Sequence, residues 1–139
     1  MSNNNKAKGV IYEYLFFSEM LSRGYELFIP AGDNLSTDCI IQNNKGEILK
    51  IQIKGTSKAQ NRPSNGPRYK INAANGSSTK KPIDCYDVDI LAVYIEPKEL
   101  WYIIPCRNLM NRKSIWFYPD NEKSTAQYEE YKSAWNVLD

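Results

Sequence analysis

The sequence has no histidine in its 139 residues, and this absence excludes several kinds of chemistry. Ser–His–Asp and Cys–His catalytic systems use an imidazole as their base, and many zinc enzymes use it as a ligand. The three cysteines (Cys39, Cys85 and Cys106) form no Cys-x-x-Cys pair, so we expect small buried thiols in a reducing compartment and no zinc site. Catalysis would have to use carboxylates, amides, lysine, tyrosine or a metal ion held by oxygen ligands.

Long hydrophobic runs are also missing. No apolar stretch approaches the roughly 20 residues that cross a bilayer, and the first residues do not form the hydrophobic part of a signal peptide. A length of 139 residues is that of one ordinary domain, and 42% of hydrophobic residues is enough for a folded core. We therefore expect a single cytoplasmic domain over residues 1–139, with no membrane partner.

Acidic residues are absent from residues 50–82, although this quarter of the chain carries eight of its 18 lysines and arginines. One interpretation is a solvated, flexible surface loop, since charge runs usually are that. The other is a surface for nucleic acid, because unpaired like charges repel one another until a polyanion neutralises them. Tyr69 stands between two cations and is expected to contact DNA, whereas Trp101, Trp116 and Trp135 are expected in the core. The candidate DNA-binding side chains are Lys58, Arg62, Arg68, Tyr69, Lys70, Lys80 and Lys81.

Hydrophobic periodicity predicts an α+β or α/β fold. A helix is expected over residues 6–23, where Val10, Tyr14, Phe17 and Leu21 form an apolar stripe at three- and four-residue steps. The other expected elements are strands at residues 25–30, 37–42, 47–54, 88–95, 100–104 and 114–118, a short helix at 106–111 and a final helix at about 125–138. This order predicts a mixed central sheet flanked by helices. The basic segment between the third and fourth of these strands is expected to be rich in loops.

The strand expected at residues 47–54 places two polar side chains on one face. Side chains alternate across a sheet, so Gln52 and Lys54 face one side while the apolar residues between them face the core. The turn at residues 43–46 pairs residues whose numbers add up to about 90, which sets Asp38 opposite Gln52. The alternative is that Asp38 is a turn residue and that Gln52 and Lys54 lie on a solvated face of the sheet.

These residue types suit a hard divalent cation. Mg²⁺ or Mn²⁺ takes oxygen ligands, which Asp38, Gln52 and the main-chain carbonyl of Ile53 would supply. Lys54 would orient or deprotonate an attacking water and offset the negative charge that develops on a phosphate. The sequence therefore predicts phosphodiester hydrolysis at these residues, directly before the basic segment.

This pattern resembles the PD-(D/E)XK nuclease superfamily. The resemblance is carried by Asp38, by the sequence Gln-Ile-Lys-Gly at residues 52–55 and by Glu13 in the preceding helix; further similar stretches lie at residues 23–25, 86–89, 101–105 and 131–135. It is closest to the small group-I-intron homing endonucleases, with archaeal-type Holliday junction resolvases as the neighbouring branch. The resemblance implies a restriction-endonuclease-like αβββαβ core, a divalent metal and cleavage of DNA.

Carried over by position, the resemblance makes Glu13, Asp38 and Gln52 residues of the metal site and Lys54 the catalytic lysine. Two features depart from the family pattern: Gln52 replaces the commoner glutamate, and no proline directly precedes Asp38. Glu13 lies one position off the predicted apolar stripe, so an ordinary surface role is the alternative. We expect a site role because Gly9, one turn earlier, would let the helix approach closely.

The predicted function is that of a Mg²⁺-dependent DNA endonuclease. One such chain offers one active site, so cutting both strands needs a homodimer or a higher homo-oligomer with two-fold symmetry. The sequence does not separate a homing or restriction-type enzyme from a junction-resolving one. A non-catalytic DNA-binding module with the same fold is the alternative, kept open by Gln52, and an RNA-binding protein is a further one.

Overall fold

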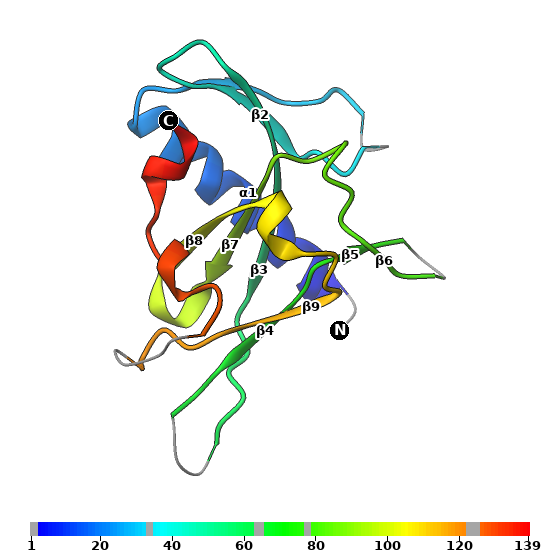
Figure 1. Cartoon of the computed structure of the whole chain (residues 1–139), viewed down its shortest axis with the longest axis vertical. Helices are drawn as coiled ribbons and strands as arrows, with labels where there is room; N and C mark the ends of the chain where they lie inside the picture. The colour runs from blue at the N-terminus through cyan, green and yellow to red at the C-terminus, as the bar shows by residue number, and fades with distance from the viewer. Residues whose placement is uncertain (1–2, 33–34, 63–65, 77–78, 122–125) are drawn as a thin grey trace.

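The computed structural model describes residues 3–32, 35–62, 66–76, 79–121 and 126–139 (Figure 1). Helix α1 (Asn3–Ser22) packs against one face of a five-stranded sheet with the strand order β1-β2-β3-β7-β8. The strands of this sheet are β1 (Glu26–Phe28), β2 (Cys39–Gln42), β3 (Ile48–Thr56), β7 (Ile90–Ile95) and β8 (Leu100–Pro105).

The sheet is mixed. Strands β1, β2 and β3 form an antiparallel meander, β3 pairs with β7 in parallel, and β7 pairs with β8 in antiparallel. All six residues of β7 are buried, as expected for an apolar strand inside a sheet. The predicted α+β fold with a mixed central sheet is therefore confirmed.

The hairpin between β2 and β3 sets the register of the site. Cys39 pairs with Ile51, and Gln42 pairs with Ile48, so paired residues have numbers that add up to 90 as predicted. Gly46 ends the turn with a φ of 83°, a left-handed conformation that glycine adopts at low cost. The turn chemistry therefore fixes which residue of β2 faces which residue of β3.

Helix α1 buries a different face from the one predicted. Tyr12, Phe16 and Met20 are buried against the sheet together with Phe17, the one member of the predicted stripe that is buried. The other three predicted stripe residues are exposed: Val10 by 47%, Tyr14 by 65% and Leu21 by 62%. The prediction failed because the helix carries apolar residues almost all around, so spacing alone does not choose the buried side.

The crossover from β3 to β7 is built mostly from strands. It contains β4 (Tyr69–Asn72), which pairs with β9 (Ser114–Phe117), and the hairpin of β5 (Ala74–Asn75) and β6 (Lys81–Pro82). The basic segment is therefore less loop-rich than expected. Within the described part of this crossover no α-helix occurs, so the second helix of the αβββαβ pattern is not found there. The β4–β9 ribbon covers the other face of the sheet and encloses a second core with it.

The predicted final helix is wrong. The described part of this segment forms two short 3₁₀ helices, η3 (Glu129–Tyr131) and η4 (Trp135–Leu138). Between them Lys132 forms a bridge with Tyr102 of β8, and the N–H of Ser133 donates to the carbonyl of Trp101 (2.8 Å). The tail uses its main-chain groups to pair with β8, which prevents a continuous helix.

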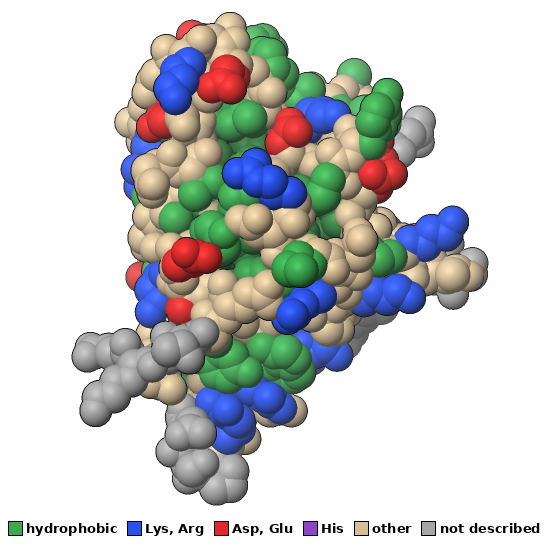
Figure 2. Space-filling model, viewed as in Figure 1, with side chains coloured by type: hydrophobic (Ala, Val, Ile, Leu, Met, Phe, Trp, Pro, Cys, Tyr) green, Lys and Arg blue, Asp and Glu red, His purple; other side chains and the backbone are tan. Residues whose placement is uncertain are grey.

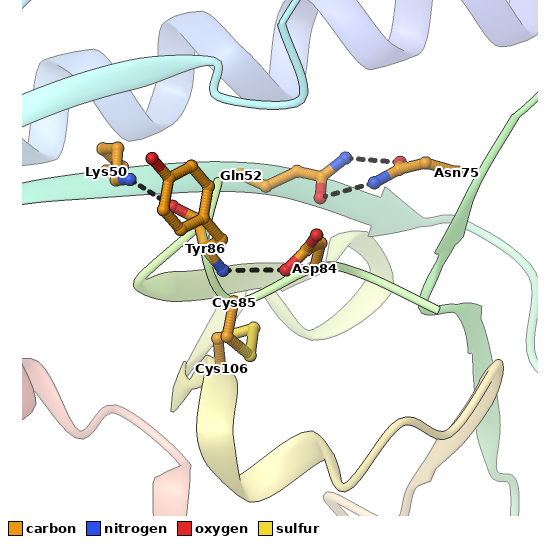
Figure 3. Close-up of a disulfide and its surroundings, with 7 residues drawn as sticks. All are labelled: Lys50, Gln52, Asn75, Asp84, Cys85, Tyr86 and Cys106. Atoms are coloured by element: carbon orange, nitrogen blue, oxygen red, sulfur yellow. Dashed lines mark hydrogen bonds between the residues drawn. A yellow bond between two sulfur atoms is a disulfide. The ribbon is translucent and has the colours of Figure 1, made fainter. Parts of the chain in front are cut away.

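The cysteine prediction is wrong for two of the three residues. Cys85 and Cys106 form a disulfide (Figure 3), and Cys85 lies at the surface. Cys39 is free and fully buried, as predicted. A spacing of 21 residues gave no signal, because the fold alone brings the start of β7 close to the end of β8. In the described ranges, no helix combines the length and the hydropathy that a membrane span requires.

Candidate active site

Asp38 lies where strand β2 separates from β3. Its N–H donates to the carbonyl of Ile51 (2.8 Å), and its carboxylate oxygen Oδ2 accepts a hydrogen bond from the N–H of Ile53 (2.7 Å). The side chain takes the place that a main-chain carbonyl of β2 would otherwise fill. Asp38 is therefore hydrogen-bonded to the two neighbours of Gln52 in β3 and lies opposite Gln52, as the predicted register requires.

Glu13 approaches Asp38 from helix α1, and the two carboxyl groups share a hydrogen bond. Burial, then the charge of Asp38 and the hydrogen bond with it, raises the pKa of Glu13 to about 7. Burial also raises the pKa of Asp38, against the opposing effects of the Ile53 N–H, of Glu13 and of the Lys54 charge. Near neutral pH the two carboxyls therefore share a proton, which a bound cation would displace.

Gly55 lets helix α1 approach strand β3 closely. A Cβ on Gly55 would lie 2.4 Å from the ring of Tyr12, so any side chain there would push the helix away. Because Tyr12 precedes Glu13, this contact holds the carboxyl near Asp38. The sequence pattern had pointed to Gly9 for this role, but a Cβ on Gly9 would meet nothing within 4 Å, so that prediction is wrong.

Gln52 is paired with a residue that sequence reasoning missed. Its Nε2 donates to Oδ1 of Asn75 in β5 (2.8 Å), and the Nδ2 of Asn75 lies 3.4 Å from Oε1 of Gln52 (Figure 3). The same Nδ2 is also 3.4 Å from the hydroxyl of Ser36. Gln52 is 7% exposed, so this partner satisfies an amide that water does not reach freely. In the sequence, Asn75 gives only the Asn-Gly signal of a turn with Gly76.

Lys54 lies on the same face of β3 as Gln52, and its Nζ is 3.4 Å from the carbonyl of Ala74. Burial lowers the pKa of Lys54, and Lys80 lowers it further, while the charge of Asp38 opposes this change. A partly desolvated ammonium beside a carboxylate is suited to proton transfer and to charge stabilisation near a phosphate. The structure thus brings Glu13, Asp38 and Lys54 together with Gln52.

The oxygen atoms at this place fit a hard cation. Asp38 and Glu13 offer carboxylates, and the Ile53 carbonyl points to the same side as its N–H, where β2 has ended. In the described ranges, no three Asp, Glu, His or Cys side chains gather closely enough to hold a metal, so further ligands would be neutral oxygens such as the amide of Gln52. Two acids with neutral oxygens suit Mg²⁺, which keeps several of its waters.

A groove of about 430 Å³ runs past this place, between the start of α1, the end of β3 and strand β4. Its described lining contains no Asp or Glu and includes four lysines: Lys8, Lys54, Lys58 and Lys70. Lysine rows of this kind bind the phosphates of nucleic acids. Figure 2 shows Lys and Arg side chains gathered in its lower and right-hand part, where Figure 1 places β4, β5 and β6.

The predicted DNA contact of Tyr69 is wrong. Tyr69 is 2% exposed and faces the second core, whereas Trp116, which was expected in the core, is half-buried on the outward face of the same ribbon. The guanidinium of Arg68 lies 3.9 Å from the centre of the Trp116 ring. The core position of Trp101 is confirmed, whereas Trp135 is partly buried and packs against the edge of that core.

The predicted cations all reach the surface. Arg62 lies over the ring of Tyr118 (4.9 Å), and the Nζ of Lys80 donates to the carbonyl of Gly76 (2.6 Å). Lys81 is exposed on β6. The basic segment therefore presents its charges from the β4–β9 ribbon, the β5–β6 hairpin and the groove, all on elements that adjoin Lys54.

A mixed sheet with two carboxyls, an amide and a lysine where two strands separate is the arrangement of a nuclease. The chain belongs to the PD-(D/E)XK endonuclease family, whose model matches residues 3–138. Its function is that of a nuclease, and the resemblance seen in the sequence is confirmed.

Two solved structures share the fold. A bacterial homing endonuclease, I-Ssp6803I, is 22% identical with a TM-score of 0.80, over 97% of this chain and 93% of that one. Hjc, a Holliday junction resolvase from Archaeoglobus fulgidus, is 16% identical with a TM-score of 0.50, over 87% of each chain. No curated protein sequence matches the chain significantly.

Proposed function

We propose that the protein is a Mg²⁺-dependent endonuclease that hydrolyses phosphodiester bonds in DNA, with Mn²⁺ as a substitute metal. The observation that carries this proposal is the position of Lys54: it lies beside Asp38 and also lines a groove whose described residues include four lysines and no acid. A polyanion in this groove would place a phosphate next to the two carboxyls.

In this proposal Glu13, Asp38, the amide of Gln52 and the carbonyl of Ile53 hold the cation. A bound cation would polarise the phosphate and lower the pKa of an attacking water. Lys54 contacts that phosphate or the water and offsets the negative charge as it develops. The other lysines of the groove hold neighbouring phosphates and position the strand, without reading its sequence.

The test is a panel of supercoiled plasmid, linear duplex and four-way junction DNA, since the two similar structures are a homing endonuclease and a junction resolvase. Each substrate is incubated with Mg²⁺, with Mn²⁺ and with chelator. We expect metal-dependent nicking by the wild type and a loss of at least about a hundredfold in Asp38→Ala and Lys54→Ala. Lys45→Ala, at the exposed hairpin turn, is the matched control and should cut normally.

Two other outcomes would overturn the proposal. A salt-sensitive complex with DNA but no nicking in either metal would identify a non-catalytic DNA-binding module. Tighter binding to RNA than to duplex and junction DNA in a competition experiment would identify an RNA-binding protein. Preference between plasmid and junction decides which kind of DNA endonuclease the protein is.

We also propose a homodimer, because one site cuts one strand. The outward side of α1 is the interface we favour: Val10, Ile11, Tyr14, Leu15 and Leu21 are all exposed there, and clustered apolar surface of this kind marks contacts between proteins. The particle mass in solution should be that of two chains or more. Replacing Tyr14 and Leu21 by lysine should give single chains, and a wild-type protein of one chain's mass would contradict the dimer.

We place the protein in the cytoplasm and treat residues 1–139 as one domain. Cytoplasmic thiols keep most cysteines reduced. In that compartment the fold and the nuclease activity must persist when the Cys85–Cys106 bond is open.

A further inference from the structure

The β4–β9 ribbon has one buried face and one open face. Tyr69, Ile71, Ile115 and Phe117 point into the second core, and each is at most 4% exposed. On the other face lie two cross-strand pairs, Lys70 with Trp116 and Asn72 with Ser114. Lys70, Asn72 and Ser114 are exposed, so this face is polar, basic and open to a partner.

The open face carries cations stacked on an aromatic ring. Arg68 lies 3.9 Å and Lys70 5.9 Å from the centre of the Trp116 ring. The ion pairs found between described residues join other side chains, so neither cation is neutralised by a carboxylate there. Because Arg68 covers the ring, Trp116 holds cations in place and does not offer a bare surface for an unstacked base.

The open face leads directly into the active-site groove. Lys70 and Asn72 line this groove together with Lys54. Alternate residues of β4 share a face, so Asn72, Lys70 and Arg68 form a row about 13 Å long that begins at the groove. A two-stranded β-ribbon fits into the major groove of B-DNA, which is roughly 12 Å wide.

We propose that the open face of the β4–β9 ribbon enters the major groove of duplex DNA and aligns the duplex on Lys54. Arg68 and Lys70 bind phosphates, held by Trp116, while Asn72 and Ser114 face the edges of the bases. This inference rests on the proposed function and adds the element that recognises the duplex.

The test measures the binding of a short random-sequence duplex and of one of its strands by fluorescence anisotropy, with Ca²⁺ in place of Mg²⁺ to prevent cutting. Arg68→Ala and Lys70→Ala should each weaken duplex binding about tenfold and lower the slope of log affinity against log salt by about one. Arg23→Ala is the matched control, because Arg23 stacks in the same way on Trp135 (4.0 Å) at the far end of α1. It should bind the duplex as the wild type does.

A further pair of variants separates the role of Trp116 from folding. Trp116→Phe keeps a ring under the cations and should bind nearly as the wild type, whereas Trp116→Ala should lose affinity. If the alanine variant has a lower unfolding temperature, Arg68→Ala and Lys70→Ala still decide the question, since Lys70 is exposed and Arg68 is only half-buried.

Duplex binding by Arg68→Ala and Lys70→Ala equal to that of Arg23→Ala would overturn the inference. So would a larger loss on the single strand than on the duplex, because the ribbon would then be a single-strand platform. The wild type could also fail to cut any DNA while Arg68→Ala and Lys70→Ala still bind the duplex more weakly. That result would overturn the proposed nuclease activity and leave the ribbon's role in duplex binding intact.

The base-edge contacts have their own measurement. A pool of random duplexes is enriched for binding by the wild type and by Asn72→Ala, and the recovered sequences are compared. We expect the variant to lose the preference at one or two base pairs. Identical recovered sequences would show that the ribbon contacts the DNA backbone alone and would overturn this part of the proposal.

Discussion

Gln52 and Asn75 form a pair of side-chain amides, with Nε2 of Gln52 2.8 Å from Oδ1 of Asn75. Gln52 stands where the family pattern more often has a glutamate. An amide has one oxygen, so it can bind a cation only when this oxygen, and not the NH₂ group, points at the cation. A carboxylate can bind through either of its oxygens. Oδ1 of Asn75 accepts a hydrogen bond from the NH₂ group of Gln52, and Nδ2 of Asn75 lies 3.4 Å from Oε1 of Gln52, so this pairing fixes which way the Gln52 amide is turned.

We therefore predict that Asn75→Ala weakens metal binding. The concentration of Mn²⁺ at half-saturation, measured by calorimetry without DNA, should rise about tenfold, because partners that orient metal ligands have effects of this size. Gln52→Glu in the same chain should restore binding, since a carboxylate needs no such orientation.

The restoring variant separates a positioning role from a structural one. If Asn75→Ala merely loosened the β5–β6 hairpin, a glutamate at position 52 would not repair it. Unchanged half-saturation in Asn75→Ala, or no recovery in the double variant, would contradict the positioning role.

A second prediction concerns the two glycines near the active site. Gly55→Ala should lower the free energy of unfolding by about 1–3 kcal/mol, because its methyl group would overlap the ring of Tyr12. Gly9→Ala should raise it by about 0.5–1 kcal/mol, because that position lies in a helix with open space around it. Urea unfolding measures both, and equal effects of the two substitutions would contradict the close approach at Gly55.

A third prediction follows from the pKa of Glu13, raised from 4.5 to about 7. Between these two values the folded protein keeps a proton that the unfolded chain has released. Without metal, this contribution to stability is complete below about pH 4.5 and is lost as the pH rises through about 7. Metal binding should strengthen over the same range, because the cation displaces the proton.

The comparison protein for this measurement is Glu13→Gln, which cannot release a proton at position 13. Urea unfolding in chelator, at several pH values from about 4 to about 8, should show a decline for the wild type that is smaller in the variant. Parallel curves for the two proteins would contradict the assignment of the titration to Glu13.

A fourth prediction concerns the disulfide. The Cys85–Cys106 bond closes a loop with a sequence separation of 21, so reducing it should lower the free energy of unfolding by about 3 kcal/mol. Nicking at temperatures well below unfolding should persist, because the described lining of the groove beside Lys54 contains neither cysteine. Reductant should have no effect on the stability of Cys85→Ser. A wild type whose stability ignores reductant would contradict the cross-link.

The sequence predicted the part of the site that strand alternation and turn chemistry determine. Asp38 lies opposite Gln52 because the turn at residues 43–46 fixes the register of β2 and β3. The turn and the alternation of side chains depend only on residues that are close in the sequence. Asn75 was not predictable in this way. It meets Gln52 only after the chain has crossed from one strand to another, and a partner 23 residues away leaves no local pattern.

The errors have the same physical origin. Tyr69 and Trp116 are both aromatic, and a shift of one residue along a strand exchanges buried and exposed sides, so composition does not reveal which of them faces outward. On α1, apolar residues cover both sides of the helix, so their spacing does not select the buried side. In the C-terminal segment, the bridge between Lys132 and Tyr102 of β8 overrides the helical spacing of the apolar residues. In each case tertiary contacts decide what the local sequence leaves open.

The most direct test of a shared cation at Asp38 and Lys54 is Mn²⁺ binding without DNA, measured by calorimetry on three proteins. The wild type should bind Mn²⁺, Asp38→Asn should bind it at least about tenfold more weakly, and Lys54→Met should bind it at least as well as the wild type while failing to nick DNA. Equal Mn²⁺ binding by Asp38→Asn and the wild type would contradict the account.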